Sequence, residues 1–271
     1  MKTRVITAVA LLPLLLLVVL AAPKIFTAIL FAAMAAIAAY ELLSGTGLVK
    51  HVRLCLYSAA SAFWCVLWCG LPISYAWLLL GILVFWVLIF AEMMASKMQL
   101  GFDKTAVCLA AGVISPLLFG AIVRLHGNAQ GRFYILIPFV LAFLSDTGAY
   151  FTGLRFGKHK LAPVISPKKT IEDVFGGVLG AILGMVIYCV ILQVIFNFRV
   201  NYLYAVIYGV LGSAAGVFGD LCFSVIKRQT GIKDYGNLFP GHGGILDRFD
   251  STMVVAPLVE ILMVLLPVAV K

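Results

Sequence analysis

The sequence predicts an all-α, polytopic integral membrane protein with about nine transmembrane helices and two polar cytoplasmic loops. The first observation behind this prediction is composition: the 271 residues are 63% hydrophobic and only 11% charged, whereas a soluble globular domain carries about 25% charged residues. The second is the spacing of the apolar segments, and the third is the placement of the basic residues. The net charge of +9 comes without a basic helical patch or a nucleic-acid motif, so we expect no nucleic-acid partner.

Nine windows are apolar enough to cross a membrane, which takes about 20 mostly apolar residues per helix. In chain order they are residues 5–22, 25–43, 54–70, 73–91, 106–125, 133–154, 175–196, 201–222 and 252–270. The first window follows Lys2 and Arg4 as in a signal peptide. It is 18 residues long, however, and Pro23 stands where cleavage would fall, so we expect a retained helix. The third window is the least regular, because it contains Ser58 and Ser61.

Basic residues gather on one side of this arrangement. Nine helices place the N-terminus and the loops after the second, fourth, sixth and eighth helices on the same side, and 15 of the 20 Lys and Arg residues fall there. The other five are Lys24, Arg124, Arg132, Arg199 and Lys271. Because cytoplasmic loops are rich in Lys and Arg, the sequence predicts a cytoplasmic N-terminus and two cytoplasmic polar loops.

The chain is expected to divide into an N-terminal region of about five transmembrane helices, residues 1–132, and a C-terminal region, residues 133–271. The second region carries both long polar loops, at 155–174 and 223–251. Glycines spaced by four, which let helix backbones approach closely, also occur there. They are Gly176, Gly180 and Gly184, and then Gly212 and Gly216.

Five acidic residues fall within or at the ends of the predicted spans, where charge is costly and usually functional. Glu41 and Glu92 stand near cytoplasmic helix ends, so we expect their side chains to reach out to the interface. Glu260 lies in the middle of the last window, where a structural hydrogen bond and a chemical role are equally supported. Asp146 and Asp220 each lead into a polar loop, and we expect both to face a cavity that opens to the cytoplasm.

The first polar loop contains SPKKT, residues 166–170, which we interpret as a proline turn that leads into a helix. The hydroxyls of Ser166 and Thr170 and the ammonium of Lys169 would lie beside the N–H groups of a helix N-terminus. Such a combination suits a phosphate. Ordinary positive-inside charge explains this loop equally well.

The second polar loop points more specifically to a function. Basic residues are enough to orient a protein in the membrane, so orientation does not explain the segment PGHGG at 240–244. Gly243 and Gly244 let the backbone approach a ligand closely. Three carboxylates would lie at the water boundary of two adjacent spans: those of Asp220, Asp247 and Asp250. Carboxylates near phosphate suit Mg²⁺. Side chains that would offset phosphate charge are Lys227, Arg228, Lys233 and Arg248. For His242, a turn hydrogen bond and catalysis are equally supported, and zinc is not expected. We therefore expect a membrane-level site for a polyphosphate, a metal ion and a lipid.

Residues 224–250 resemble the signature of the bacterial phosphatidate cytidylyltransferases, also called CDP-diacylglycerol synthases. The matching positions are Ser224, Lys227, Arg228, Lys233, Asp234, Gly236, Pro240, His242, Gly243, Gly244, Asp247, Arg248 and Asp250. The upstream stretch SDTGAYFTGLRFGKHKLAPVISPKKT, residues 145–170, also looks like this family. Three positions depart from its pattern: Lys168 and Asp173 replace glycines, and Phe223 stands where an acidic residue is common.

The resemblance implies the reaction CTP + phosphatidate → CDP-diacylglycerol + pyrophosphate, in the phospholipid biosynthesis of a bacterial cytoplasmic (inner) membrane. Region 133–271 would then be catalytic, with Asp220 and Asp247 as metal ligands ahead of Asp146, Asp234 and Asp250. The expected catalytic residues are Asp220, Lys227, Asp247, Arg248 and Asp250. The expected substrate-binding residues are Ser166, Lys169, Thr170, Ser224, Arg228, Lys233, His242, Gly243 and Gly244.

The partners expected from this reading are CTP, phosphatidate and membrane lipids, and a homodimer is left open. Mg²⁺ is the expected cofactor, and a second cation, monovalent or divalent, is left open. The alternative function is a membrane transporter with a cytoplasm-facing site for an anionic substrate.

Overall fold

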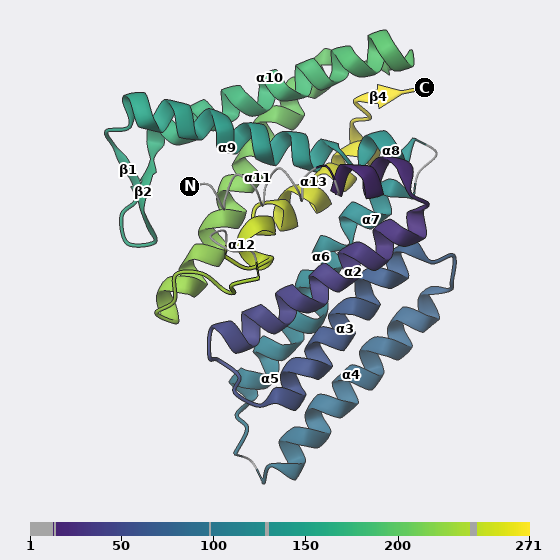
Figure 1. Ribbon diagram of the computed structural model, residues 1–271, viewed down its shortest axis with the longest axis vertical. Coiled ribbons are helices and arrows are strands. Elements are labelled where there is room, and N and C mark those ends of the chain that lie inside the picture. The colour runs from purple at the N-terminus through teal and green to yellow at the C-terminus, as the bar shows by residue number, and fades with distance from the viewer. Residues whose placement is uncertain (1–12, 14, 98, 128–129, 239–242) are drawn as a thin grey trace. The chain divides into compact units, whose positions relative to one another are not determined.

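The computed structural model describes residues 13, 15–97, 99–127, 130–238 and 243–271 of the chain. The chain divides into two compact units, the first of Met1–Gly127 with Lys227–Phe249 and the second of Asn128–Ile226 with Asp250–Lys271. Figure 1 labels most of the helices and strands of both units.

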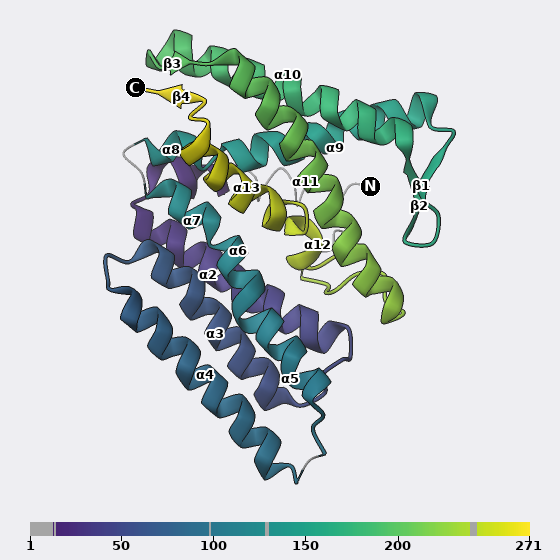
Figure 2. The same ribbon diagram turned by 180° about the vertical axis from the view of Figure 1, so that it is seen from behind.

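The first unit begins with long apolar helices that pack side by side. They are α2 (Lys24–Tyr40) with the π-helix η1 (Glu41–Gly45) at its end, α3 (Val52–Gly70) and α4 (Tyr75–Ala95). Figures 1 and 2 show α2, α3 and α4 as neighbouring, nearly parallel rods. Small residues let α2 and α3 meet, since a Cβ added to Gly70 would lie only 2.2 Å from the Cβ of Ala28.

The next span of the first unit is interrupted. Its pieces are α5 (Phe102–Leu109), the π-helix η2 (Ala110–Ile114), α6 (Ser115–Phe119) and α7 (Ala121–His126). Phe119 packs edge to face against Phe31 of α2 and against Phe249 of α12 (Leu246–Phe249), with ring centroids 5.6 Å apart in both pairs. The segment that carries α12 is therefore anchored in the core of this unit.

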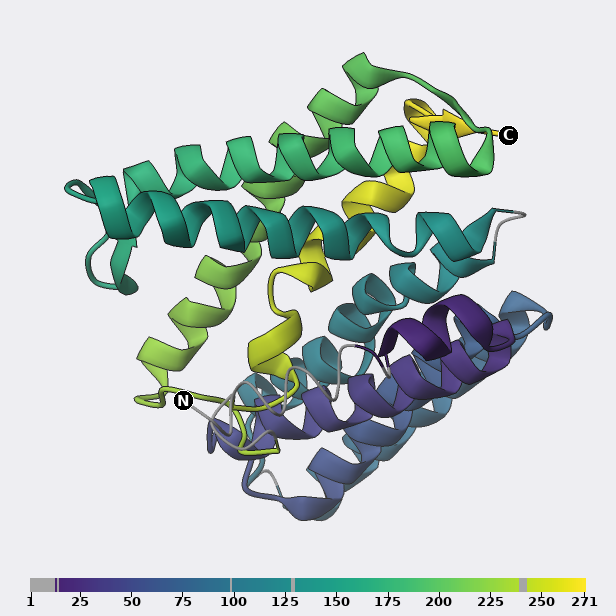
Figure 3. The same ribbon diagram turned by 45° about the horizontal axis from the view of Figure 1, so that its top comes forward.

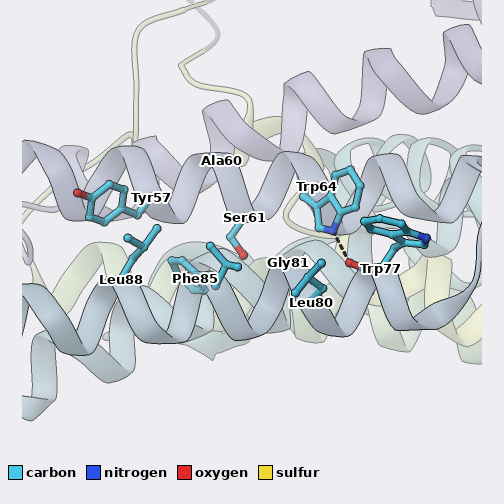
Figure 4. A pocket seen from close by; sticks show the side chains of 10 residues that line it. Tyr57, Ala60, Ser61, Trp64, Trp77, Leu80, Gly81, Phe85 and Leu88 are labelled. Carbon is cyan, nitrogen blue, oxygen red and sulfur yellow. Dashed lines mark hydrogen bonds between the residues drawn. The ribbon is translucent and has the colours of Figure 1, made fainter.

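An apolar cavity of about 360 Å³ lies between α3 and α4. Figure 4 shows Trp64 of α3 donating its Nε1–H to the backbone oxygen of Trp77 of α4, at 3.0 Å. Ser61 and Phe85 also line the cavity, and none of its lining residues is charged. This cavity suits hydrocarbon and offers no charged side chain to neutralise a phosphate.

In its described residues, the second unit contains three long helices, two shorter helices and two pairs of short strands. Its elements are α8 (Gly131–Tyr134), α9 (Ile137–Phe156), β1 (Lys160–Ala162), β2 (Ser166–Thr170), α10 (Ile171–Phe196), β3 (Arg199–Val200), the part of α11 (Tyr202–Gln229) up to residue 226, α13 (Thr252–Leu265) and β4 (Ala269–Val270). Figure 3 shows α9 and α10 running side by side. The antiparallel hairpin β1–β2 joins these two helices, and β3 pairs antiparallel with β4.

The predicted fold class is confirmed: the chain is an all-α, multi-pass membrane protein. Among the described residues, seven helical segments are long and apolar enough to span a membrane, and they correspond to the second through eighth predicted windows. Half of the first window, residues 5–12 and 14, lies outside the described residues. The ninth is shorter than predicted, because α13 has 14 residues and rises about 21 Å, against a hydrocarbon core of about 30 Å. The predicted count of nine is therefore not confirmed.

The segment 166–170 forms a strand and not the proline turn that the sequence predicts. The turn lies earlier, at residues 163–165, where Pro163 presets a turn conformation. Pro167 is tolerated within β2 because both strands of a two-stranded sheet are edges. The helix start that the sequence predicts after this segment is confirmed, since α10 begins at Ile171.

Glycines bring α9 and α10 into backbone contact, as predicted for Gly176 and Gly180. A Cβ added to Gly180 would lie 2.3 Å from the backbone oxygen of Leu144, and one added to Gly148 would lie 2.3 Å from the backbone oxygen of Gly176. Backbone atoms cannot rotate out of the way as a side chain can. These glycines therefore hold the two helices that flank the hairpin β1–β2.

We expect Gly180→Ala to destabilise the protein by about 1–3 kcal/mol, because the added methyl overpacks a backbone contact. Gly216→Ala is the matched control: the nearest atom to its added Cβ is 3.6 Å away, an ordinary contact, and alanine favours a helix over glycine by up to about 1 kcal/mol. Thermal unfolding of both variants in detergent measures the difference. Equal changes in Tm would contradict this account of the packing.

Candidate active site

Asp247 is enclosed by hydrogen-bond donors of the first unit. Only 2% of its side chain is exposed. Its Oδ2 accepts the backbone N–H of Tyr235 at 2.8 Å and that of Gly244 at 3.0 Å. Its Oδ1 lies 3.0 Å from Nζ of Lys227. The carboxylate is therefore fixed on one side by backbone and presents its other oxygen to a cation.

The local backbone around Asp247 depends on Gly243. This residue has φ +83°, a left-handed backbone conformation that residues other than glycine rarely adopt. A Cβ there would also lie 2.9 Å from Oδ2 of Asp247. The turn directs the N–H groups that follow it toward carboxylates, and the short helix α12 begins directly after it.

Lys227 is held near the end of α11 by two contacts. Its side chain is 13% exposed. Besides the ion pair with Asp247, its Nζ lies 5.3 Å from the ring centroid of Tyr235, within the range of a cation–π contact. The sequence identified Lys227 and Asp247 as site residues, and the structure places them in direct contact.

A second acid–lysine pair lies in the second unit. Nζ of Lys169, on β2, donates to Oδ2 of Asp220, on α11, at 2.7 Å. The hydroxyl of Ser224, one turn further along α11, lies 3.5 Å from Oδ1 of Asp220. The Lys169 and Asp220 side chains are 16% and 33% exposed, so this pair is more open to solvent than the Lys227–Asp247 pair.

Thr170 caps α10. Its Oγ1 accepts the backbone N–H of Asp173 at 3.3 Å, and Oδ2 of Asp173 accepts the backbone N–H of Thr170 at 2.5 Å. This is a reciprocal capping box, and the threonine is 4% exposed. The departure at Asp173 thus completes a helix cap. Ser166 stands at the other end of β2, paired with Ala162.

The other predicted residues fall into several groups. Those with exposed side chains are Asp146, Arg228, Lys233, Asp234 and Arg248. Asp250 is buried, and its Oδ1 accepts the backbone N–H of Ser251 at 2.7 Å, just before α13. Gly244 is buried beside Asp247. His242 lies outside the described residues, so its role is not tested.

Glu41 is a residue whose place the sequence analysis missed. We expected its side chain at the membrane interface, but it is 7% exposed and accepts the backbone N–H groups of Ile245 at 3.2 Å and Leu246 at 3.0 Å. The expectation is therefore wrong for Glu41. Glu92, by contrast, lies near the exposed Arg53, at 3.4 Å. An acidic residue directly after a helix as apolar as α2 could have drawn attention to Glu41. Its partners, however, are about 200 positions away in the sequence.

Comparison with known proteins decides the family. A model described as the cytidylyltransferase family matches residues 2–266. The chain belongs to this family. It is 36% identical over 184 residues to a phosphatidate cytidylyltransferase of Staphylococcus epidermidis, an alignment that covers 68% of each chain. It is 38% identical over 169 residues to proteins of the same name from Staphylococcus aureus and Staphylococcus saprophyticus, covering 62% of this chain and 63% of theirs.

Membership of the cytidylyltransferase family makes this protein an enzyme, a nucleotidyltransferase. The transporter alternative is therefore set aside. The chemistry that the family name describes needs groups that neutralise phosphate. Both acid–lysine pairs supply such groups, and both combine residues predicted from the sequence.

The donor set of this cytidylyltransferase suits Mg²⁺. In the described part of the chain, no group of three or more His, Cys, Asp or Glu side chains could hold one metal ion. Mg²⁺ is usually bound by only one or two carboxylates together with substrate phosphates and water. Asp220 could supply such a carboxylate, since its side chain is 33% exposed. Asp247 could offer only Oδ1, because Oδ2 is taken by two backbone N–H groups.

Proposed function

We propose that this cytidylyltransferase transfers the cytidylyl group of CTP to phosphatidate, giving CDP-diacylglycerol and pyrophosphate. The observation that carries the proposal is the buried Lys227–Asp247 ion pair, which lies within the stretch that matches the phosphatidate cytidylyltransferase signature. The relatives that bear this name support the choice of the lipid substrate.

The reaction needs charge neutralisation more than proton transfer. An oxygen of the lipid phosphate attacks the α-phosphorus of CTP, a new P–O bond forms, and the bond to the β-phosphate oxygen breaks as pyrophosphate leaves. A phosphate monoester has a second pKa of about 6, so the attacking oxygen is ionised near neutral pH and needs no general base. The barrier is the approach of two anions, which positioned cations lower.

Lys169 and Lys227 are the cations that we assign to the reacting phosphates. Each is held by a carboxylate, at 2.7 Å and 3.0 Å respectively. An ammonium has three donors, so a lysine oriented by one carboxylate can also donate to a phosphate. Asp220, Ser224 and Lys227 recur at i, i+4 and i+7 along α11, a spacing that places them on one face of the helix.

Exposed basic residues would bind the outer phosphates. Arg228, Lys233 and Arg248 have exposed side chains and can follow a bound nucleotide or headgroup. Arginine is suited to this because its planar fork can bind two phosphate oxygens at once. We assign these three to the β- and γ-phosphates of CTP and to the lipid headgroup.

We propose Asp220 as a carboxylate that would hold Mg²⁺, and Oδ1 of Asp247 as the oxygen that Asp247 could offer to a cation. When bound, it would neutralise charge on the α-phosphate and on the leaving pyrophosphate. The lysine beside each aspartate would then orient substrate phosphates. A second cation stays open.

We also propose that the site faces the cytoplasm from a bacterial cytoplasmic (inner) membrane, with the N-terminus on the same side. The support is the bias of the basic residues, 15 of 20 of which fall on one side of the predicted arrangement, because Lys and Arg mark cytoplasmic loops. CTP is a cytoplasmic metabolite, so this orientation gives the enzyme its soluble substrate.

The proposed function is tested with purified, folded protein, CTP and phosphatidate in detergent micelles, with and without MgCl₂. We expect CDP-diacylglycerol to form only with Mg²⁺. A folded protein that makes no CDP-lipid under either condition would contradict the proposal, and equal rates after chelation would contradict the metal assignment.

A further inference from the structure

Glu41 joins the end of an N-terminal helix to the turn that precedes Asp247. Its carboxylate accepts the N–H groups of Ile245 and Leu246, and the N–H just before them, that of Gly244, goes to Oδ2 of Asp247. Three consecutive backbone donors are thus divided between two buried carboxylates. A shift of the Glu41 side chain would therefore also move the Gly244 N–H that donates a hydrogen bond to Asp247.

Two glycines make room for Glu41. A Cβ added to Gly236 would lie 2.4 Å from Oε1 of Glu41, and a Cβ added to Gly244 would lie 2.4 Å from Oε2. Neither glycine has a positive φ, so their lack of a side chain is explained by this close approach and not by backbone strain. Both positions belong to the signature stretch, although the side chain that they accommodate lies far outside it.

The π-helix that begins at Glu41 fits the same turn. A Cβ added to Gly45, its last residue, would lie 2.0 Å from the backbone oxygen of Tyr235. Tyr235 donates its N–H to Asp247 and its ring faces Lys227. π-Helical turns inside α-helices frequently occur at functional sites. Both ends of η1 therefore contact the backbone that orients the Lys227–Asp247 pair.

We propose that Glu41 is a positioning residue of the cytidylyltransferase site, which fixes the turn at 243–246 and through it the orientation of Asp247 and Lys227. The inference rests on the proposed function, because it assigns Glu41 to the same reaction. It gives the N-terminal helices a part in the chemistry beyond anchoring the protein in the membrane. Glu41 itself touches no reacting atom in this assignment.

Glu41→Gln tests the proposal, since it keeps the length of the side chain but replaces one acceptor oxygen with a donor. We expect kcat to fall about 10–100-fold, with KM for CTP changed less than about threefold, because misplacement of a catalytic group by about 1 Å can cost 10²-fold in rate. Glu92→Gln is the matched control: it is the same change in the same unit, at a residue that pairs with the exposed Arg53. We expect its kcat to equal that of the wild type.

Gly236→Ala disturbs the contact between Glu41 and the turn without changing Glu41 itself. The added methyl should push the carboxylate away from Ile245 and Leu246 and lower kcat to a similar degree. In Glu41→Ala the space is free, so Glu41→Ala/Gly236→Ala should be no slower than Glu41→Ala alone, as expected for two changes that remove one interaction. Multiplying defects would overturn the proposal.

A merely structural role predicts another result. Glu41→Gln would then lower Tm and the folded yield, while kcat per folded molecule would stay at the wild-type value, and that outcome overturns the proposal. Inactive wild-type protein would refute the proposed function itself. Active wild type with an unimpaired Glu41→Gln variant would refute only the inference about Glu41.

Discussion

Asp247→Asn is expected to reduce cytidylyl transfer by about 10²–10³-fold, the range seen when one preorganised electrostatic group is removed from an active site. The substitution keeps the shape of the side chain, and the amide oxygen can still accept the N–H groups of Tyr235 and Gly244. What it removes is the charge opposite Lys227. The ammonium then loses the partner that orients it, and the proposed metal loses one ligand.

The same variant is expected to lose about 3–5 kcal/mol of stability, because removal of one partner of a buried pair leaves the other charge uncompensated. The two side chains are 13% and 2% exposed, so water offers little compensation. Lys227→Met/Asp247→Asn separates the two effects: removal of the stranded ammonium should restore much of the stability without restoring activity. Tm in detergent and kcat per folded molecule are the two measurements. Restored activity in this double variant would contradict a catalytic role for the pair.

Asp220→Asn is expected to lower kcat/KM by about 10²-fold or more at a fixed Mg²⁺ concentration, with little change in Tm. The pair with Lys169 is more exposed than the buried pair, and exposed pairs contribute only about 0–1 kcal/mol. Activity should therefore fall in both aspartate variants, whereas a large loss of stability is expected only at Asp247.

A magnesium titration gives the assignment of Asp220 a second readout. The Mg²⁺ concentration for half-maximal activity should rise on the order of tenfold or more in Asp220→Asn, as is typical when support for a bound metal is weakened. Asp103→Asn, a change of the same type at an exposed residue of α5, is the control and should leave the titration unchanged. An unshifted titration in Asp220→Asn would exclude that residue as a metal ligand.

The spans were predictable from the sequence because membrane crossing depends on apolar length. The C-terminal end of the last apolar helix, α13, was harder to predict from the sequence. Pro257 lies inside α13 without ending it, whereas the helix stops at Leu265, two residues before Pro267. Only the second proline coincides with a helix end, and composition alone does not distinguish the two.

The site residues were predictable to the extent that they lie near each other in the sequence. Lys227 and Asp247 belong to one short stretch, and their contact follows from its fold. The helix start after Thr170 was predicted, but its role as the cap was not, because the sequence analysis assigned its hydroxyl to a phosphate. A threonine followed three positions later by an acidic residue is nevertheless a known mark of a helix start. The place of Glu41 was not predictable, because hydropathy locates a charge along a helix but does not identify a partner 204 positions away.

The fate of each phosphate of CTP tests the central claim most directly. Purified protein is supplied with phosphatidate, Mg²⁺ and CTP labelled at either the α- or the γ-phosphate, and lipid and aqueous products are separated. We predict that the α-label enters the lipid and the γ-label leaves as pyrophosphate, in equal amounts. Transfer of the γ-label to the lipid, or release of the α-label as free CMP without a lipid product, would contradict cytidylyl transfer at this site.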